Sequence, residues 1–359
     1  MKKIYYITAV FATLFLVGCG DGIDLPGVNV ETDLNKIPLP DNNVNLEQVE
    51  LKPSTEPMLH EGLHTEEDFQ RIRDKKAAGE EPWVSAYQLL VESQFSQKTA
   101  DTYPTEWIKR GVSGDENYMN AARGATIAYQ QALRWKIEQD DEYAAKAVEN
   151  LNKWVQTCVG VTGNTNLSLA AGLYGYEFAI AGELLRDYGG WDRADFAAFQ
   201  NWLLKVFYPA NDDFLKRHHD TNALHYWANW CLCNIAAKMA IGIVTDRRDI
   251  YNEGIGHLQT GDTNGRLRRA IYHDYAPDYN FAQWQESGRD QGHTLMCVGL
   301  MGIICQLAWS QGDDFFAYDD NLFMRACEYA ACCNYTNETV PYTTYIWQKQ
   351  SQWGYPIPE

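Results

Sequence analysis

Apolar and aromatic residues recur at helical spacing over most of the chain, and this periodicity constrains the fold more than any other feature. The first predicted helix begins after Thr65, a typical N-cap residue followed by acidic residues in the first turn. Further helices are predicted over Trp83–Gln97, Tyr118–Glu138, Glu142–Cys158, Leu169–Tyr188, Ala194–Val206, Asn222–Ile243, Asp290–Gln311 and Asn321–Cys333. Strand-like alternation is nearly absent, so we expect an all-α chain.

The breaks between the predicted helices are short and contain Gly, Asn, Asp or Pro, as in 189–190, 209–213 and 312–314. Helices joined by short loops pack antiparallel, and a series of such hairpins can curl into a solenoid or close into a toroid. Without a sequence repeat of fixed period, short-repeat solenoids are disfavoured. We expect an (α/α) toroid, an incomplete barrel of antiparallel helical hairpins with an open cleft. No capping helix is predicted after 333, so the last hairpin is expected to be incomplete.

The N-terminal residues have the pattern of a bacterial lipoprotein signal. Lys2 and Lys3 precede an apolar run over 4–17, and Leu16-Val17-Gly18-Cys19 resembles a lipobox. We expect a signal peptide at 1–18, a lipid on Cys19, a flexible tether at 19–57 and one toroid domain at 58–359. No later stretch of about 20 residues is free of polar groups, so the lipid is the only membrane contact expected. The predicted location is the periplasm or the cell surface.

Composition excludes some partners and leaves others open. The formal net charge is -18, which disfavours nucleic acid. A local basic cleft could still bind an anionic sugar polymer. The eight cysteines other than Cys19 lack the spacings of a zinc site and lie in apolar contexts, so we expect packed free thiols. The sequence predicts no oligomeric state.

Polar chemistry is concentrated in three segments, 216–230, 265–275 and 286–293. Six of the eight histidines fall between 218 and 293, and Arg217, Arg266, Arg268, Arg269 and Arg289 lie in the same three segments. A cationic and aromatic centre in an otherwise acidic protein predicts an anion site. No His-Glu-x-x-His pattern is present, and neither a metal nor a cofactor is expected.

This set of residues suits β-elimination on a polyuronate, a sugar polymer with a carboxylate at C6. Abstraction of the C5 proton requires that the charge of the carboxylate be neutralised, which Asn, His or Arg can do. A base then takes the C5 proton and an acid protonates the departing O4, roles that Tyr or His can fill. All four residue types occur in this window.

Three runs also resemble a known family. They are Asn-x-x-His-Tyr-Trp-Ala-Asn-Trp at 222–230, Arg-Arg-Ala-Ile-Tyr-His-Asp-Tyr-Ala-Pro at 268–277 and Gln-Glu-Ser-Gly-Arg-Asp-Gln-Gly-His at 285–293. They are similar to alginate lyases of the helical-toroid type, closest to polysaccharide lyase family 38 and more distantly to family 5. The segments 62–73 and 79–83 resemble the opening of that domain, and together the likeness covers about 60 to 335.

The resemblance implies metal-independent cleavage of a polyuronate, alginate or glucuronan. It implies that Tyr272 is the acid and a candidate base at one uronate epimer, that Arg266 sits against Tyr272 or the carboxylate, and that Asn222 helps to neutralise the carboxylate. His225 is the second candidate base. In family 5 the Asn and His are adjacent, whereas two residues separate Asn222 from His225 here. His218 and His219 are therefore alternatives.

Other side chains of the window are candidates for substrate binding: Arg289, His293, His273, Arg269 and Trp227. Each has a structural alternative. Arg289 and His293 could orient the site from the start of a helix, and Trp227 could pack in the core. Of the neighbours Arg268 and Arg269, only one can face a cleft.

Two other functions remain open. A glycoside hydrolase of the same toroid fold would use paired carboxylates, with Asp220, Asp274, Glu286 and Asp290 as candidates. Each lies beside a cation that would keep it ionised. A non-catalytic surface lipoprotein could instead bind glycans with its aromatic side chains, but the clustered Arg, His and Tyr residues argue against it.

Overall fold

The computed structural model describes residues 54–335, 340–343 and 345. The predicted signal peptide, Cys19 and nearly all of the predicted tether lie outside them. The described chain divides into two compact units. We call residues 54–214 and 233–254 the first unit, and residues 215–232 together with those from 255 onward the second unit. The expectation of a single domain from residue 58 stays a prediction.

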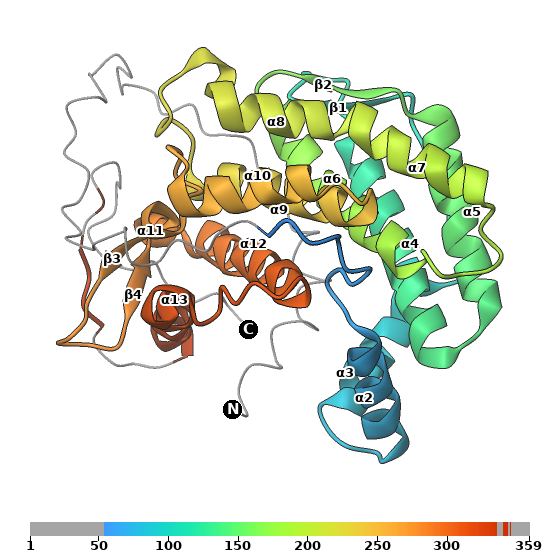
Figure 1. The fold of residues 1–359 in the computed structure, drawn as a ribbon, viewed down its shortest axis with the longest axis horizontal. Coiled ribbons are helices and arrows are strands. Elements are labelled where there is room, and N and C mark those ends of the chain that lie inside the picture. Colours follow the sequence, from blue (N-terminus) through green and yellow to red (C-terminus); the bar gives the residue numbers. More distant parts are fainter. Residues whose placement is uncertain (1–53, 336–339, 344, 346–359) are drawn as a thin grey trace. The chain divides into compact units, whose positions relative to one another are not determined.

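The first unit is built mainly from helices that pack against one another (Figure 1). Helix α4 packs on α5 and α6, and α7 packs on both α5 and α6. Between these helices, the ring of Phe178 lies 5.3 Å from that of Trp154 and 5.2 Å from that of Trp202. The helices of this unit are α2 (Glu66–Ala77), α3 (Trp83–Glu92), α4 (Tyr118–Glu138), α5 (Asp141–Thr157), α6 (Leu167–Leu184), α7 (Arg193–Val206) and most of α8 (Tyr208–Arg217).

Two short parallel strands and a 3-10 turn complete the first unit. Strand β1 (Trp107–Arg110) pairs with β2 (Gly160–Gly163), with Arg110 opposite Gly163. The 3-10 turn η4 spans Gln94–Ser96. Helices α9 (Ala228–Val244) and α10 (Arg248–Thr260) contribute residues to both units.

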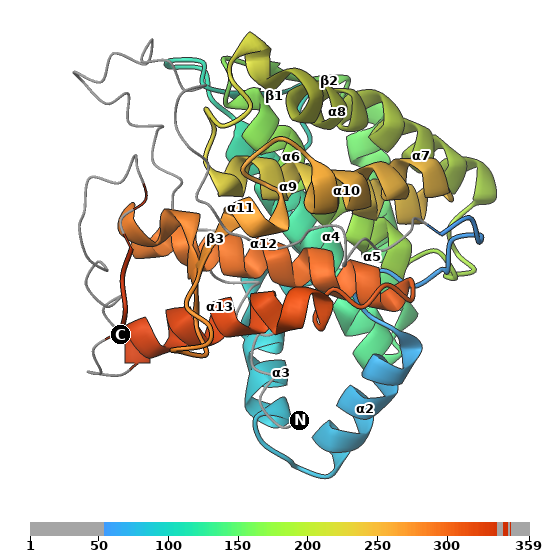
Figure 2. The same ribbon diagram turned by 60° about the vertical axis from the view of Figure 1, so that its left-hand side comes forward.

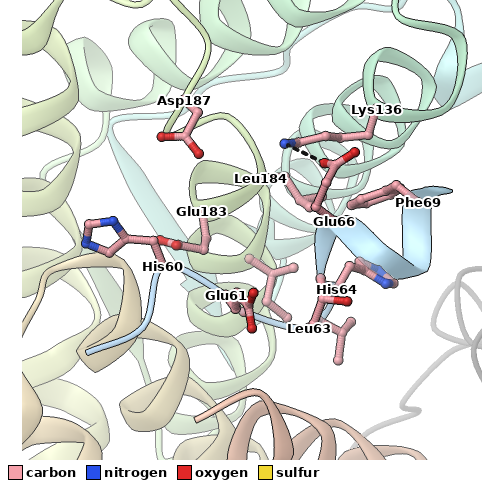
Figure 3. Close-up of a pocket in the computed structure, with 13 residues that line it drawn as sticks. His60, Glu61, Leu63, His64, Glu66, Phe69, Lys136, Glu183, Leu184 and Asp187 are labelled. Carbon is pink, nitrogen blue, oxygen red and sulfur yellow. Dashed lines mark ion pairs between the residues drawn. The ribbon is translucent and has the colours of Figure 1, made fainter. Parts of the chain in front are cut away.

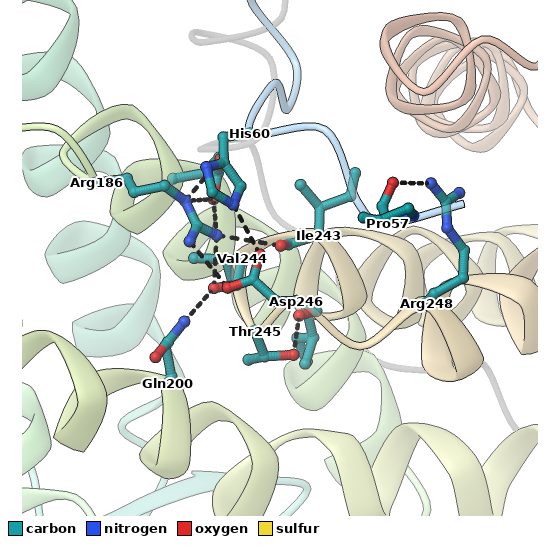
Figure 4. Close-up of polar contacts among 11 residues, drawn as sticks. Pro57, His60, Arg186, Gln200, Ile243, Val244, Thr245, Asp246 and Arg248 are labelled. Atoms are coloured by element: carbon teal, nitrogen blue, oxygen red, sulfur yellow. Dashed lines mark hydrogen bonds and ion pairs between the residues drawn. The ribbon is translucent and has the colours of Figure 1, made fainter. Parts of the chain in front are cut away.

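Helix ends in the first unit are closed by side chains. Thr65 and Asp68 form the capping box that the sequence predicts at the start of α2. At the other end of a helix, Arg186 donates hydrogen bonds to the carbonyl oxygens of Ile243 (3.2 Å) and Val244 (2.9 Å), the last residues of α9 (Figure 4). A cationic side chain suits this position because the exposed carbonyls carry partial negative charge.

The second unit combines helices with a β-hairpin. Strand β3 (Ile271–Asp274) pairs antiparallel with β4 (Ala282–Trp284), with a register shift between Ile271 and His273. The hairpin packs against α13 (Figures 1 and 2). The other elements of this unit are the 3-10 turns η5 (His218–Asp220) and η6 (Gln285–Gly288) and the helices α11 (Leu267–Ala270), α12 (Gln291–Ser310) and α13 (Tyr318–Tyr335).

The structure corrects the sequence prediction at 209–213, which forms part of α8 and not a loop. Pro209 is the second residue of α8, where a missing backbone N–H removes no helical hydrogen bond. Two polar residues of this segment make tertiary contacts: the Asn211 amide donates to Asn234 Oδ1 (2.8 Å), and Asp212 pairs with Lys238 (2.7 Å). The polar residues that suggested a loop instead form a hydrogen bond and an ion pair inside the first unit.

The sequence prediction also missed α10, α11 and the strands, and it placed the start of α9 too early. Asn222 accepts the backbone N–H of Leu224 through its side chain (2.8 Å), which closes a turn. The helix therefore begins at Ala228 and not at Asn222.

Helix α12 is the one described helix that is long and apolar enough to cross a membrane by length and composition. It packs on η6 and α13, and 61% of its most apolar window is buried, as in a core helix. The eight described cysteines are free thiols, and Cys158, Cys231, Cys233, Cys297 and Cys305 are buried. The expected packed thiols are thus confirmed for these five.

We predict that Lys238→Ala destabilises the protein by about 3 kcal/mol, because it leaves two carboxylates without their buried partner. The Lys238 side chain is fully buried and its ammonium lies 2.7 Å from Asp212 and 2.5 Å from Glu253. Urea denaturation would measure the loss, with exposed Lys205→Ala as the control. Equal stability of the two variants would contradict the prediction.

Candidate active site

A run of buried polar side chains lies at the centre of the second unit. Gln283, Gln285, Glu286 and Ser287, at the end of β4 and in η6, are all at most 1% exposed. Buried polar groups are costly unless they are hydrogen-bonded. The partners of these four side chains therefore show which segments the run holds in place.

The run first fixes the start of α9. Gln285 Oε1 accepts the backbone N–H of Ala228 (2.9 Å), and Glu286 Oε1 accepts both the backbone N–H (2.9 Å) and the side-chain amide (2.7 Å) of Asn229. A carboxylate is stabilised at the positive end of a helix. The segment 222–230 is thereby positioned by residues 57 positions later in the sequence.

Tyr272 lies beside the same run, on β3, and is 3% exposed. Its hydroxyl donates a hydrogen bond to the carbonyl oxygen of Thr343 and accepts one from Gln283 Nε2 at 3.3 Å. Its ring lies edge-on to Tyr345, with the centroids 5.1 Å apart. Burial, with smaller contributions from neighbouring tyrosines, raises the pKa of Tyr272 well above its usual value. The hydroxyl is therefore protonated at neutral pH.

Gln283 connects Tyr272 to its surroundings. Its Nε2 donates to Ser287 Oγ (2.8 Å) and to the Thr343 carbonyl (2.9 Å), while its Oε1 accepts the N–H of Thr343 (2.9 Å) and the hydroxyl of Tyr275. The sequence analysis missed both Gln283 and Thr343. In the sequence, the only feature that points to Gln283 is its position two residues before the 285–293 run.

The arginines in α11 and at its N-cap divide into two groups. Arg268 pairs with Asp319 and with Asp274 (3.3 Å), and Arg325 also pairs with Asp274 (2.9 Å). Burial by itself would raise the pKa of Asp274, but the hydrogen bond from Arg325 and the other cationic and backbone donors lower it overall. Arg268 thus stabilises the end of β3 through ion pairs.

Arg266 and Arg269 form no ion pair within the described residues. Arg266 Nε is buried and has no hydrogen-bond partner there, and Arg269 donates to the carbonyl oxygen of Asp262. Burial and the neighbouring charge of Arg266 lower the pKa of Arg269. Two adjacent guanidinium groups without a carboxylate are suited to bind an anion. Of the pair Arg268 and Arg269, only Arg269 is left for this role.

Arg289 and His293 have structural partners. Arg289 donates to Glu286 Oε2 (3.0 Å) and lies 5.2 Å above the ring of Trp227. His293 Nδ1 lies 2.6 Å from Asp290, which also caps α12 by accepting the N–H of His293 (2.8 Å). These contacts are compatible with the structural alternative, in which Arg289 and His293 orient the site, and their predicted role in substrate binding stays a prediction. Trp227 is half-buried between Arg289 and Tyr345, whose ring centroid is 6.1 Å away.

The histidine candidates differ in exposure. His225 is exposed and its ring contacts that of Tyr226 (4.9 Å), whereas His218 is only 6% exposed. Partial desolvation of each ring by the surrounding protein lowers the pKa of both histidines from its usual value, so both rings are mostly neutral at pH 7. The buried Asn264, which the sequence analysis missed, donates to the carbonyl oxygens of Leu224 (3.0 Å) and Tyr226 (2.8 Å) on either side of His225.

His219 and His273 lie beside further rings. His219 is 5.8 Å from Tyr226, in a turn where residues 218–220 all have positive φ. His273 lies 4.4 Å from the ring of Tyr275, and burial lowers its pKa although Asp274 opposes the shift.

The carboxylates proposed for a hydrolase are all paired with basic side chains. Glu286 is bound by Arg289, Asp220 by Arg217 (3.0 Å), Asp290 by His293 and Asp274 by Arg325. The pKa of Asp290, like that of Asp274, is lowered overall despite burial, because His293 donates to it. A glycosidase needs one carboxylic acid that keeps its proton, and these four positions are not suited to supply it. Among the described residues no cluster of three or more His, Cys, Asp and Glu could hold a metal ion.

A pocket of about 270 Å³ lies in the first unit (Figure 3). Its charged lining is mostly acidic, with Lys136 pointing toward Glu66 at 3.8 Å. Glu183 in its wall is held by Arg186 (2.8 Å), which also pairs with Asp246 (3.1 Å; Figure 4). An acidic lining repels polyanions, so this pocket is not suited to a polyuronate.

Comparison with known proteins identifies the class to which this fold and site belong. The family model described as alginate lyase matches residues 72–338. The chain therefore belongs to the alginate lyase family and is a polysaccharide lyase. No curated protein sequence matches the chain.

Solved structures similar to the chain include alginate lyases from two bacteria. Alginate lyase A1-III from Sphingomonas species A1 has 13% identity and a TM-score of 0.54, over 77% of this chain and 79% of that chain. An alginate lyase from Bacteroides ovatus has 14% identity and a TM-score of 0.54, over 75% and 82%. At this identity the likeness concerns the fold, and the predicted all-α helical-toroid class is confirmed.

We predict that Asp274→Asn destabilises the protein by about 2 kcal/mol at pH 7 because it weakens hydrogen bonds between charged groups. The pKa of Asp274 is lower in the folded than in the unfolded protein, so its contribution is present above about pH 4 and is lost as the pH falls further. Denaturation of both proteins at pH 7 and pH 3 would measure it. A stability difference that grew on acidification would contradict this assignment.

Proposed function

We propose that the protein cleaves an anionic polyuronate, alginate or glucuronan, by metal-independent β-elimination with Tyr272 as the acid. The main support is the environment of the Tyr272 hydroxyl, which is buried, protonated and held by Gln283. The substrate class is supported by a similar structure, an A1-III variant in complex with a tetrasaccharide, which has 14% identity and a TM-score of 0.54.

In this proposal the Tyr272 hydroxyl donates to the glycosidic O4 in place of the Thr343 carbonyl. A base removes the C5 proton, the electron pair forms the C4–C5 double bond, and the C4–O4 bond breaks. The Tyr272 proton passes to the departing oxygen. Water does not take part, so one product carries an unsaturated uronate at its new nonreducing end and the other carries the released oxygen as the C1 hydroxyl of a new reducing end.

The base is a neutral histidine of the segment 218–225. A tyrosine whose pKa is raised by burial holds its proton and is better suited to be the acid than the base. His225 is exposed and its pKa is lowered, so it can reach a substrate and accept a proton at pH 7. His218 and His219 are the alternatives in the same segment.

Arg266 and Arg269 neutralise the uronate carboxylate. Negative charge builds up on the carboxylate as C5 loses its proton, and positive groups placed there in advance stabilise the transition state. Neither guanidinium is paired with a carboxylate of the described chain. Asn222, whose side-chain oxygen is engaged by Leu224, is the third candidate for this role.

We predict that purified protein produces unsaturated uronate from alginate or glucuronan, measured by ultraviolet absorbance, and that Tyr272→Phe lowers kcat by at least about 100-fold while polymer binding is retained. Tyr279→Phe, a change at an exposed tyrosine of the same hairpin, is the matched control. If reducing ends appeared without absorbance, a hydrolase would be indicated. Full activity of Tyr272→Phe would refute the acid assignment.

We also propose that the mature protein is a lipoprotein held at the periplasmic or outer face of the envelope by a lipid on Cys19. A tether of about 40 residues follows that position in the sequence. We predict that Cys19→Ala moves the protein from the membrane fraction to the soluble fraction and abolishes incorporation of labelled fatty acid. Persistent labelling of the variant would show that the lipid is not on Cys19.

A further inference from the structure

Arg110, at the end of β1 in the first unit, is a buried arginine without an anionic partner among the described residues. It is 5% exposed, and its Nη1 atom is buried without a hydrogen-bond partner in the described part of the chain. Its guanidinium lies 4.6 Å from the ring of Tyr118 and forms no ion pair with a described residue. Burying an arginine without a counter-ion is unfavourable, so this position calls for an anion.

The position of Tyr118 places the Arg110 guanidinium at the N-terminus of α4. Tyr118 is the first residue of this 21-residue helix. The N-cap residue Asn117 makes no capping bond to the helix, because its Oδ1 accepts the N–H of Lys109 (2.7 Å) and its Nδ2 donates to the Trp107 carbonyl (2.9 Å). The positive end of α4 therefore adds to the charge of Arg110.

The acidic residues that follow Arg110 in the sequence, at positions 115 and 116, are engaged elsewhere. Asp115 pairs with Lys109 at 2.6 Å, and Glu116 accepts the backbone N–H of Gly111 at 2.6 Å. Arg123, in the second turn of α4, likewise has only a ring contact within the described residues, with Tyr103 at 5.6 Å. In a chain with a formal net charge of -18, this concentration of unpaired positive charge is unusual.

We propose that Arg110 and the N-terminus of α4 bind a carboxylate of the polyuronate, at a subsite of the first unit additional to the Tyr272 site of the second unit. The ligand class rests on the proposed function. A uronate carboxylate suits the planar fork of a guanidinium, which can donate two parallel hydrogen bonds to it. The exposed aromatic rings of Tyr103 and Trp107, 40% and 42% exposed, belong to the same segment and offer apolar surface for sugar rings.

Direct binding tests this subsite without relying on turnover. In a Tyr272→Phe background, calorimetric titration with an alginate oligosaccharide is expected to give a Kd about tenfold weaker when Arg110→Met is added. Lys109→Met is the matched control, because it removes the same charge one residue away from a side chain already paired with Asp115. It is expected to leave Kd within about twofold.

The unliganded proteins supply a second measurement. Removing a buried unpaired charge is expected to raise Tm in Arg110→Met, whereas a structural arginine would lower it. Arg110→Lys keeps the positive charge but lacks the planar guanidinium, so it is expected to bind the oligosaccharide with intermediate affinity. It replaces Arg110→Met in the binding experiment if the Met variant does not fold.

The affinities decide between the outcomes. Equal Kd values for the Arg110 and Lys109 variants would overturn the subsite. Arg110-dependent binding of inorganic sulfate with no Arg110-dependent binding of the oligosaccharide would mean a free-anion site and would also overturn it. Failure of the proposed function would look different, since wild-type protein would then release no unsaturated uronate from any polyuronate.

Discussion

The buried polar run from Gln283 to Ser287 is the interaction on which the rest of the second unit depends. Four polar side chains without access to water must find partners inside the protein, and their partners are the start of α9, the hydroxyls of Tyr272 and Tyr275, Arg289 and the backbone of Thr343. Segments distant in sequence are thereby held in one arrangement. A packed apolar core would not specify hydrogen-bond geometry in this way.

The arginines of the described chain differ in whether a carboxylate neutralises them. Arg268, Arg289 and Arg325 are neutralised by carboxylates and stabilise the fold, while Arg266, Arg269 and Arg110 form no ion pair within the described chain. Although acidic residues outnumber basic ones, no carboxylate of the described chain pairs with these three arginines. An acidic enzyme can therefore attract a polyanion locally while the rest of its surface repels it.

The sequence allowed the fold class and most long helices to be predicted, because periodicity and caps such as Thr65 are local signals. Helix α8 was missed since its polar residues, Asn211 and Asp212, pair with side chains on α9 that only the fold brings near. In the same way, Gln283 and Asn264 carry no motif, and their importance comes from burial. The contacts of Thr343 with Tyr272 and Gln283 span 60 or more positions, which no spacing rule reveals.

The hydrogen-bond acceptor for Tyr272 is a main-chain carbonyl, and this has a consequence for how the site can vary. Any residue placed at position 343 still presents that carbonyl, and the N–H of every residue except proline can still pair with Gln283. Side-chain replacement there removes the contact of Thr343 Oγ1 with the Tyr275 hydroxyl (3.2 Å) but keeps the backbone hydrogen bonds to Tyr272 and Gln283. The side chain at position 343 can thus change during evolution while the Tyr272 hydroxyl keeps its orientation. What has to be retained is the course of the backbone at this position.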